Sequence, residues 1–225
     1  MSAETRRREY LKSLGIDLFT LRGSSDEPVV EGDVTADDPL GWTELRDTVA
    51  SCARCTLHQS RTQTVFGVGN PEADWMVVGE APGAEEDRRG EPFVGRAGKL
   101  LDEMLRAVGL GRQTVFIANI LKCRPPNNRD PSAEEAGACR SYLDRQIELV
   151  APKLILAVGR IAAQQLLGSD APVGRLRGRR HELGAGRLPV VVTYHPAYLL
   201  RSPGQKRKVW QDLVLARRVL KETAQ

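Results

Sequence analysis

Short apolar runs alternate with segments of helical periodicity along the chain from residue 42 onward. Four apolar runs predict buried strands, at 75–78, 114–120, 154–158 and 189–193. Apolar residues at helical spacing predict helices over about 42–51, 96–108, from 132 onward, 160–167 and 205–221. Strands that alternate with helices predict an α/β fold, a three-layer αβα sandwich around a mainly parallel sheet of about four strands.

The first 41 residues have a different pattern. Leucines recur at helical spacing within residues 1–22, which indicates a short amphipathic helix. Residues 23–41 contain six acidic residues and no Lys or Arg, and they are rich in Gly, Ser and Pro. We therefore expect a flexible N-terminal extension over 1–41 and one folded domain over 42–225.

Charge and composition limit the cellular location and the classes of binding partner that we expect for the protein. The net charge is +4 over 225 residues, but residues 42–225 alone carry +8, which suits either a polyanion partner or a plain solvated basic surface. There is no apolar run of the ~18 residues that a membrane span needs, and the N-terminus lacks the apolar stretch of a signal peptide. We expect a cytoplasmic monomer that does not contact a membrane.

Polar residues stand where three of the predicted strands end. They are Gly79 with Glu80, Asn119, and His195. Ligands of open parallel sheets bind beyond the carboxyl ends of the strands, so these residues are expected to converge on one edge. The long polar loop 79–98 joins a strand to a helix there, which is where α/β proteins carry chemistry.

The four cysteines favour a shared metal site. Cys52 and Cys55 form a C-x2-C pair. Cys123 follows a predicted strand, and Cys139 lies on one face of a predicted helix. Four thiolates suit either a tetrahedral zinc ion or a 4Fe-4S cluster, and the spacing does not choose between them. Taken alone, Cys139 reads more simply as a core residue on an apolar helix face.

Four separate motifs carry a resemblance to a known family. GEAPG at 79–83, PFVGRAG at 92–98, NILKCRPPNNRDP at 119–131 and HPAYLL at 195–200 occur in this order. From about Cys52 to the C-terminus the chain resembles the family 4 uracil-DNA glycosylases. The resemblance implies an iron–sulfur enzyme with a 4Fe-4S cluster on the four cysteines. It also implies base excision repair, in which uracil is hydrolysed from single- or double-stranded DNA to leave an abasic site.

The resemblance also implies a uracil pocket. Phe93 matches the ring that stacks on the flipped base, Asn119 the amide that reads its Watson–Crick edge, and His195 the donor to uracil O2. Further positions near the pocket are Ala81, Glu86 and Asn128.

The roles of the acidic residues stay open at this point. Glu80 is the nearest acid in the motif, and it could activate the attacking water or brace the loop through backbone N–H groups. Glu86 or Asp87 could crowd uracil C5 and exclude thymine, or simply face solvent.

DNA contacts are expected after His195. Leu199 or Leu200 would be the wedge that fills the gap left by the flipped base. Arg201, Lys206 and Arg207, followed by Lys208, would contact phosphates. A second basic cluster, which could equally be plain surface, contains Arg175, Arg177, Arg179 and Arg180.

Two other functions fit the same motifs. One is a non-catalytic iron–sulfur module that binds DNA within a repair or polymerase complex. The other is a variant of the same superfamily that traps uracil-DNA covalently. Only the glycosylase requires a preformed uracil-sized pocket together with release of free base.

Overall fold

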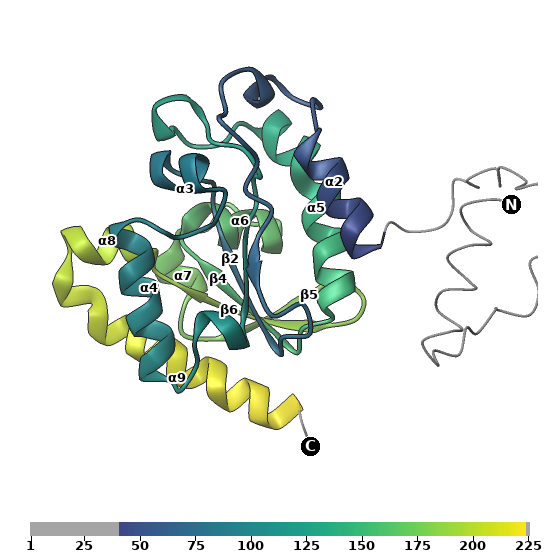
Figure 1. Ribbon diagram of the computed structural model, residues 1–225. Coiled ribbons are helices and arrows are strands. Elements are labelled where there is room, and N and C mark those ends of the chain that lie inside the picture. The colour runs from purple at the N-terminus through teal and green to yellow at the C-terminus, as the bar shows by residue number, and fades with distance from the viewer. Residues whose placement is uncertain (1–40, 224–225) are drawn as a thin grey trace, which may run out of the picture. The chain divides into compact units, whose positions relative to one another are not determined.

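The computed structural model describes residues 41–223, and these form a six-stranded sheet with helices on both faces (Figure 1). The strands are β1 (Val68–Gly69), β2 (Trp75–Gly79), β3 (Phe116–Asn119), β4 (Leu154–Val158), β5 (Arg180–Leu183) and β6 (Leu188–Thr193). The helices are α2 (Trp42–Ala50), α3 (Ala84–Arg89), α4 (Arg96–Ala107), α5 (Ala133–Val150), α6 (Arg160–Leu167), α7 (Val173–Leu176), α8 (Pro196–Arg201) and α9 (Lys206–Thr223).

The sheet confirms the predicted α/β sandwich and extends it. Its order is β1-β3-β2-β4-β6-β5, and the four predicted strands form the parallel centre. Two short antiparallel strands, β1 and β5, close the edges, so the expected count of four was too low. β5 has four residues and lies in a Gly- and Arg-rich segment. β1 has two residues, too few to give a period in the sequence.

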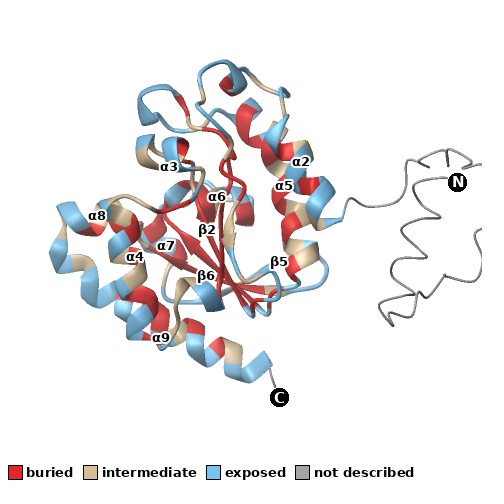
Figure 2. Ribbon diagram, in the orientation of Figure 1, coloured by how far each residue is buried: buried red, intermediate tan, exposed pale blue. Residues whose placement is uncertain are grey.

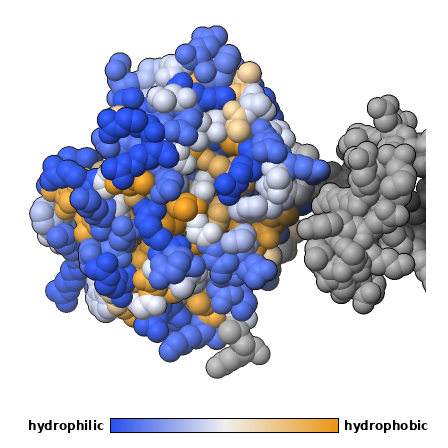
Figure 3. Space-filling view, in the orientation of Figure 1, coloured by the Kyte–Doolittle hydropathy of each residue, from blue (hydrophilic) through white to orange (hydrophobic). Residues whose placement is uncertain are grey.

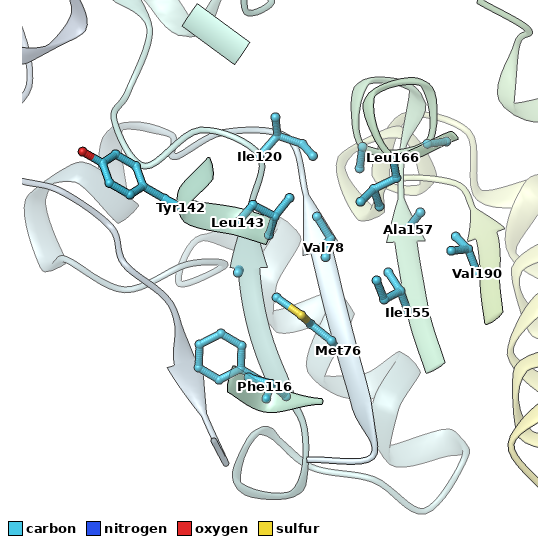
Figure 4. Close-up of a cluster of buried hydrophobic side chains, with 14 of the residues drawn as sticks. Met76, Val78, Phe116, Ile120, Tyr142, Leu143, Ile155, Ala157, Leu166 and Val190 are labelled. Carbon is cyan, nitrogen blue, oxygen red and sulfur yellow. The ribbon is translucent and has the colours of Figure 1, made fainter. Parts of the chain in front are cut away.

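Alternate residues of each central strand belong to two separate cores. On β2, Met76 and Val78 face the side covered by α2, α5, α6 and α7, whereas Trp75 and Val77 face α4 and α9. Figure 4 shows the first core, where Phe116 of β3 and Leu143 of α5 surround Met76. The central strands are buried along their lengths (Figure 2), as expected for a parallel sheet covered on both faces.

Two short helices, α3 and α8, were not predicted from the sequence. α3 begins within the polar loop after β2, and α8 follows His195 directly. Both have only six residues, so neither gives a clear helical period. The expectations for residues 1–40 lie outside the described part of the chain.

The surface that Figure 3 displays is mostly hydrophilic with scattered apolar patches. Among the described residues the large exposed apolar side chains are Leu200, Trp210 and Val214. None of the helices in that part of the chain is long and apolar enough to cross a membrane.

A capping box made by Ser132 and Glu135 stabilises the start of α5. The Ser132 hydroxyl accepts from the Glu135 N–H at 3.2 Å, and the Glu135 carboxylate accepts from the Ser132 N–H at 2.9 Å. Glu135 is buried and also pairs with Arg129 at 2.6 Å. These interactions lower the pKa of Glu135 from 4.5 to about 2, with the Arg129 hydrogen bond as the main cause.

We predict that Glu135 stabilises the fold above pH 5 and stops doing so in acid. Because its folded-state pKa is depressed, its contribution is present above the ordinary value of 4.5 and is lost as the pH falls toward 2. Glu135→Gln should lower the free energy of unfolding by about 2 kcal/mol at pH 7, allowing for water that screens the half-exposed Arg129. Urea denaturation should show this difference shrinking below about pH 4. Glu134→Gln, at the exposed neighbour, is the control, and an equal loss in both variants would contradict the assignment.

Candidate active site

The three predicted strand ends surround one cavity. Gly79 and Asn119 are paired in register at the ends of β2 and β3, and His195 follows β6. The cavity has a volume of about 790 Å³, and its walls include Glu80, Ala81, Glu86, Phe93, Asn119, Asn128 and His195. Every residue expected near the uracil pocket except Asp87 therefore lies on this cavity.

Gly79 allows two of these side chains to meet. A Cβ at this position would stand 2.5 Å from Asn119 Oδ1 and 2.5 Å from the Phe93 Cζ atom. Neither atom could remain where it is, because such distances are far below van der Waals contact. The close approach of the Phe93 ring and the Asn119 amide therefore depends on glycine at the end of β2.

Phe93 holds an unusual backbone conformation. Its φ of 55° lies in the left-handed region, which costs a residue with a side chain on the order of 1–3 kcal/mol. Gly98 of α4 packs against this segment, and a Cβ there would stand 1.6 Å from the Phe93 carbonyl oxygen. The conformation turns the ring toward His195, with ring centroids 5.6 Å apart and planes at 28°.

Glu86 braces the loop that carries Phe93. Its carboxylate accepts hydrogen bonds from the N–H groups of Gly83 at 3.1 Å, Val94 at 2.9 Å and Gly95 at 3.1 Å. The bracing role considered for Glu80 thus belongs to Glu86. Glu86 is the third residue of α3, from which a carboxylate reaches back to the N–H of the N-cap residue, here Gly83.

Asp87 points away from the cavity. It is buried, and its carboxylate accepts from the Thr62 N–H at 2.9 and 3.1 Å. Asp87 is therefore not placed to crowd the base, because it follows Glu86 by about 100° around α3 and is bonded to the Thr62 N–H instead.

The Asn119 amide is buried with an unused acceptor. The side chain is 2% exposed, and Oδ1 has no hydrogen-bond partner within residues 41–223. A buried polar atom without a partner costs about 1–3 kcal/mol, so this oxygen suits a ligand that brings an N–H group. The main chain of Asn119 is held from behind by Lys122, whose Nζ donates to its carbonyl oxygen at 2.8 Å.

His195 is held in one tautomer. Its Nδ1 lies 3.1 Å from the Ala197 backbone nitrogen, and because an amide N–H can only donate, Nδ1 must accept. The neutral ring therefore carries its proton on Nε2. Burial, aided by the Arg201 charge, lowers the pKa of His195 to about 4 and so keeps the ring neutral.

Glu80 is the acid on the cavity wall that remains available. No hydrogen bond or ion pair engages its carboxylate among the described residues. Burial is the main cause that raises its pKa above the ordinary value, and Asp130 adds to it, whereas Arg160 opposes the rise. A carboxylate of this kind can accept a proton from a bound water.

Several cavity residues were not found from the sequence. Arg160 is the first residue of α6. Tyr194 and Tyr198 also line the cavity, and the centroids of their two rings lie 5.0 Å apart. The tyrosines belong to the YHPAYLL segment, but their direction depends on α8, which was not predicted.

The residues expected to contact DNA differ from the expectation in two respects. Leu199 is fully buried in the core beneath α4 and α9, so it cannot be a wedge, whereas Leu200 is 41% exposed. Arg177 pairs with the buried Asp212 at 2.8 Å, so its charge is already engaged within the fold. Arg201, Lys206 and Arg207 are exposed at the end of α8 and the start of α9.

The four cysteines line a second, small cavity. All four thiols are free, and the cavity that they share is also lined by Arg54, Arg61 and Lys122. Arg61 Nη1 donates to Cys123 Sγ at 3.1 Å. Burial raises the pKa of Cys123 to about 11 and also raises that of Cys139, so a bound cation that replaces the proton would relieve this cost.

The donor set fits a metal group, although the described residues contain no group of three His, Cys, Asp or Glu arranged tightly enough to hold a single metal ion. The thiols stand around the cavity instead. Cys139 is both the core residue and the cavity residue that the sequence had suggested as alternatives.

Comparisons with known proteins agree with this geometry. The family model of the uracil DNA glycosylase superfamily matches residues 66–214. A type-4 uracil-DNA glycosylase of Archaeoglobus fulgidus is 45% identical over 170 residues, covering 73% of this chain and 85% of the relative. One of Thermotoga maritima is 42% identical over 181 residues, covering 79% of this chain and 94% of the relative.

The family match spans all three strand ends and the cavity between them, and the relatives are similar over most of their own length. The chain therefore belongs to the uracil-DNA glycosylase superfamily and, within it, to the type-4 uracil-DNA glycosylases.

Proposed function

We propose that this protein excises uracil from DNA by hydrolysing the N-glycosidic bond of a flipped-out deoxyuridine. The observation that carries the proposal is the unpartnered Asn119 Oδ1 beside the Phe93 ring on a preformed cavity. Uracil offers an N–H at N3 to this oxygen, whereas cytosine offers only a lone pair there. The mismatch leaves buried polar groups unpaired, at about 1–3 kcal/mol each.

The remaining walls suit a planar base. Phe93 offers a ring face for stacking, and Ala81, Glu86 and Asn128 complete the wall around the base edges. Glu86 lies on the cavity while its oxygens are tied to the loop, so it gives a fixed boundary near uracil C5. Asn128 accepts from Arg124 Nε at 2.8 Å, which orients its amide.

Bond cleavage leaves negative charge on uracil and positive charge on the sugar. The Nε2–H of neutral His195 donates to uracil O2 and stabilises the departing anion, an effect typically worth about 3–4 kcal/mol. Glu80 accepts a proton from the attacking water, whose oxygen bonds to the sugar carbon that uracil leaves. The products are free uracil and an abasic sugar.

DNA would lie along the end of α8 and the start of α9. Leu200 is the exposed apolar residue at this rim and would fill the space that the flipped base leaves. Arg201, Lys206 and Arg207 would contact phosphates, with single- or double-stranded DNA. A cytoplasmic, monomeric enzyme and a domain boundary near residue 42 stay predictions.

A 4Fe-4S cluster is the proposed cofactor, held by Cys52, Cys55, Cys123 and Cys139. Four free thiols around one cavity support it, because a polynuclear cluster takes ligands from around its volume. When bound, the cluster would supply a structural crosslink. The cysteines would then tie the segment after α2 to the β3 loop and to α5.

The alternative function is a non-catalytic DNA-binding module. Such a module does not require a cavity in which the Asn119 amide oxygen lacks a hydrogen-bond partner. The decisive experiment is the release of free uracil from uracil-containing oligonucleotides by the cluster-loaded protein, without added divalent metal. Binding of DNA without release would support the module, and a covalent adduct that persists on a denaturing gel would support the trapping variant.

We predict that Asn119→Ala and His195→Ala each lower the single-turnover rate of uracil release by at least ~10²-fold. The first variant loses base recognition and the second loses the donor to O2. Binding to an abasic-site duplex, which has no base to read, should stay within about 2-fold of the original protein. Full activity in both variants would refute the site.

The pH dependence follows from the lowered pKa of His195. Since this pKa is about 4, the ring is neutral above about pH 5, and it takes up a proton only as the pH falls through 4. A protonated Nδ1 could no longer accept from the Ala197 N–H. Between about pH 5.5 and 8 the single-turnover rate should therefore show no titration step that belongs to His195. Any step in this range should remain in the His195→Gln variant. A step near the ordinary value of 6.5 that does disappear would contradict the assignment.

Cluster binding predicts a brown protein with broad visible absorption and stoichiometric iron and sulfide. Cys123→Ser should bleach the colour and lower the temperature of unfolding, because Cys123 is a buried residue of the cavity wall and one of the four proposed ligands. A colourless preparation that contains one zinc per chain would instead establish the alternative metal.

A further inference from the structure

We propose that Arg112, fixed by Asp102, is a positioning residue that sets the plane of the Phe93 ring for stacking on the base. The proposal rests on the function proposed above. Arg112 lies in the short 3-10 helix η2 (Arg112–Thr114), outside the residues that line the cavity, so it acts through Phe93.

All three guanidinium nitrogens of Arg112 are engaged. Nε donates to Asp102 Oδ1 at 2.7 Å, and Nη1 donates to the Pro92 carbonyl oxygen at 3.1 Å. Nη2 donates to the Phe93 carbonyl oxygen. One rigid planar group therefore holds two successive carbonyls just where the backbone is strained.

The position of the Phe93 carbonyl leaves the backbone little freedom. Gly98 packs against that oxygen from α4, at a distance that admits no Cβ, while Arg112 holds the same oxygen. Gly79 confines the far tip of the ring. A left-handed φ at a phenylalanine persists only when its surroundings impose it, and Arg112 supplies the hydrogen-bonded part of that constraint.

Asp102 keeps the guanidinium in place from the neighbouring helix. The two side chains are 26% and 35% exposed, so the pair is partly shielded from water. Since Asp102 belongs to α4, the arginine links this helix to the loop that precedes it. The alternative is that Arg112 only stabilises the fold, with no effect on how the base is held.

Arg112→Lys separates these alternatives. Lysine keeps the charge but cannot hold two carbonyls and a carboxylate in one plane. We expect the single-turnover rate to fall about 10-fold and the inhibition constant of free uracil to rise about 10-fold, with binding to an abasic-site duplex unchanged. Arg106→Lys is the matched control, because Arg106 pairs with Glu103 on the same helix and does not contact the Phe93 loop.

A double-mutant cycle with Phe93→Ala completes the test. If Arg112 acts through the ring, Arg112→Lys should change the rate by less than about 2-fold in the Phe93→Ala background. Additive effects would overturn the proposal, as would a lower temperature of unfolding with an unchanged inhibition constant. Absence of uracil release by the unmodified protein would instead refute the proposed function.

Discussion

The close approach at the ends of β2 and β3 is the constraint on which the site depends. Parallel pairing sets Gly79 beside Asn119, and the missing Cβ of Gly79 leaves the space that the Phe93 ring and the Asn119 amide occupy. The pairing follows from two apolar runs that must both be buried. The proposed base recognition would thus be a consequence of strand register, and His195 reaches the same edge because β6 is parallel to the other central strands.

Hydrogen bonds hold the strained backbone of Phe93 in place. Phe93 adopts a backbone conformation that it would not choose alone, and Glu86 and Arg112 hold the loop on either side of it through main-chain groups. Arg112 does so from outside the cavity, whereas Glu86 also forms part of the cavity wall. If Phe93 stacks on the base as proposed, a ring fixed before the base arrives loses less conformational freedom on binding, which lowers the free-energy cost of recognition.

The sequence predicted the parts of this arrangement that depend on local pattern. Long apolar runs gave the four parallel strands, and their polar ends gave Asn119 and His195. Directions set by short helices could not be read in the same way. Leu199 turns inward because α8 packs on the core, and Asp87 turns away because α3 is a helix and not an irregular loop.

One buried lysine, Lys122, contacts residues of both cavities. Lys122 lines the cysteine cavity, and its Nζ donates to the Asn119 carbonyl oxygen and to Gln146 Oε1 at 2.6 Å. Burial lowers its pKa to about 7, whereas the neighbouring cysteines, once ionised, raise it. Thiolates in that cavity therefore favour the charged amine that best holds the Asn119 main chain. The proposed cluster site and the amide proposed to read the base would thus be linked by charge as well as by the short segment 119–123.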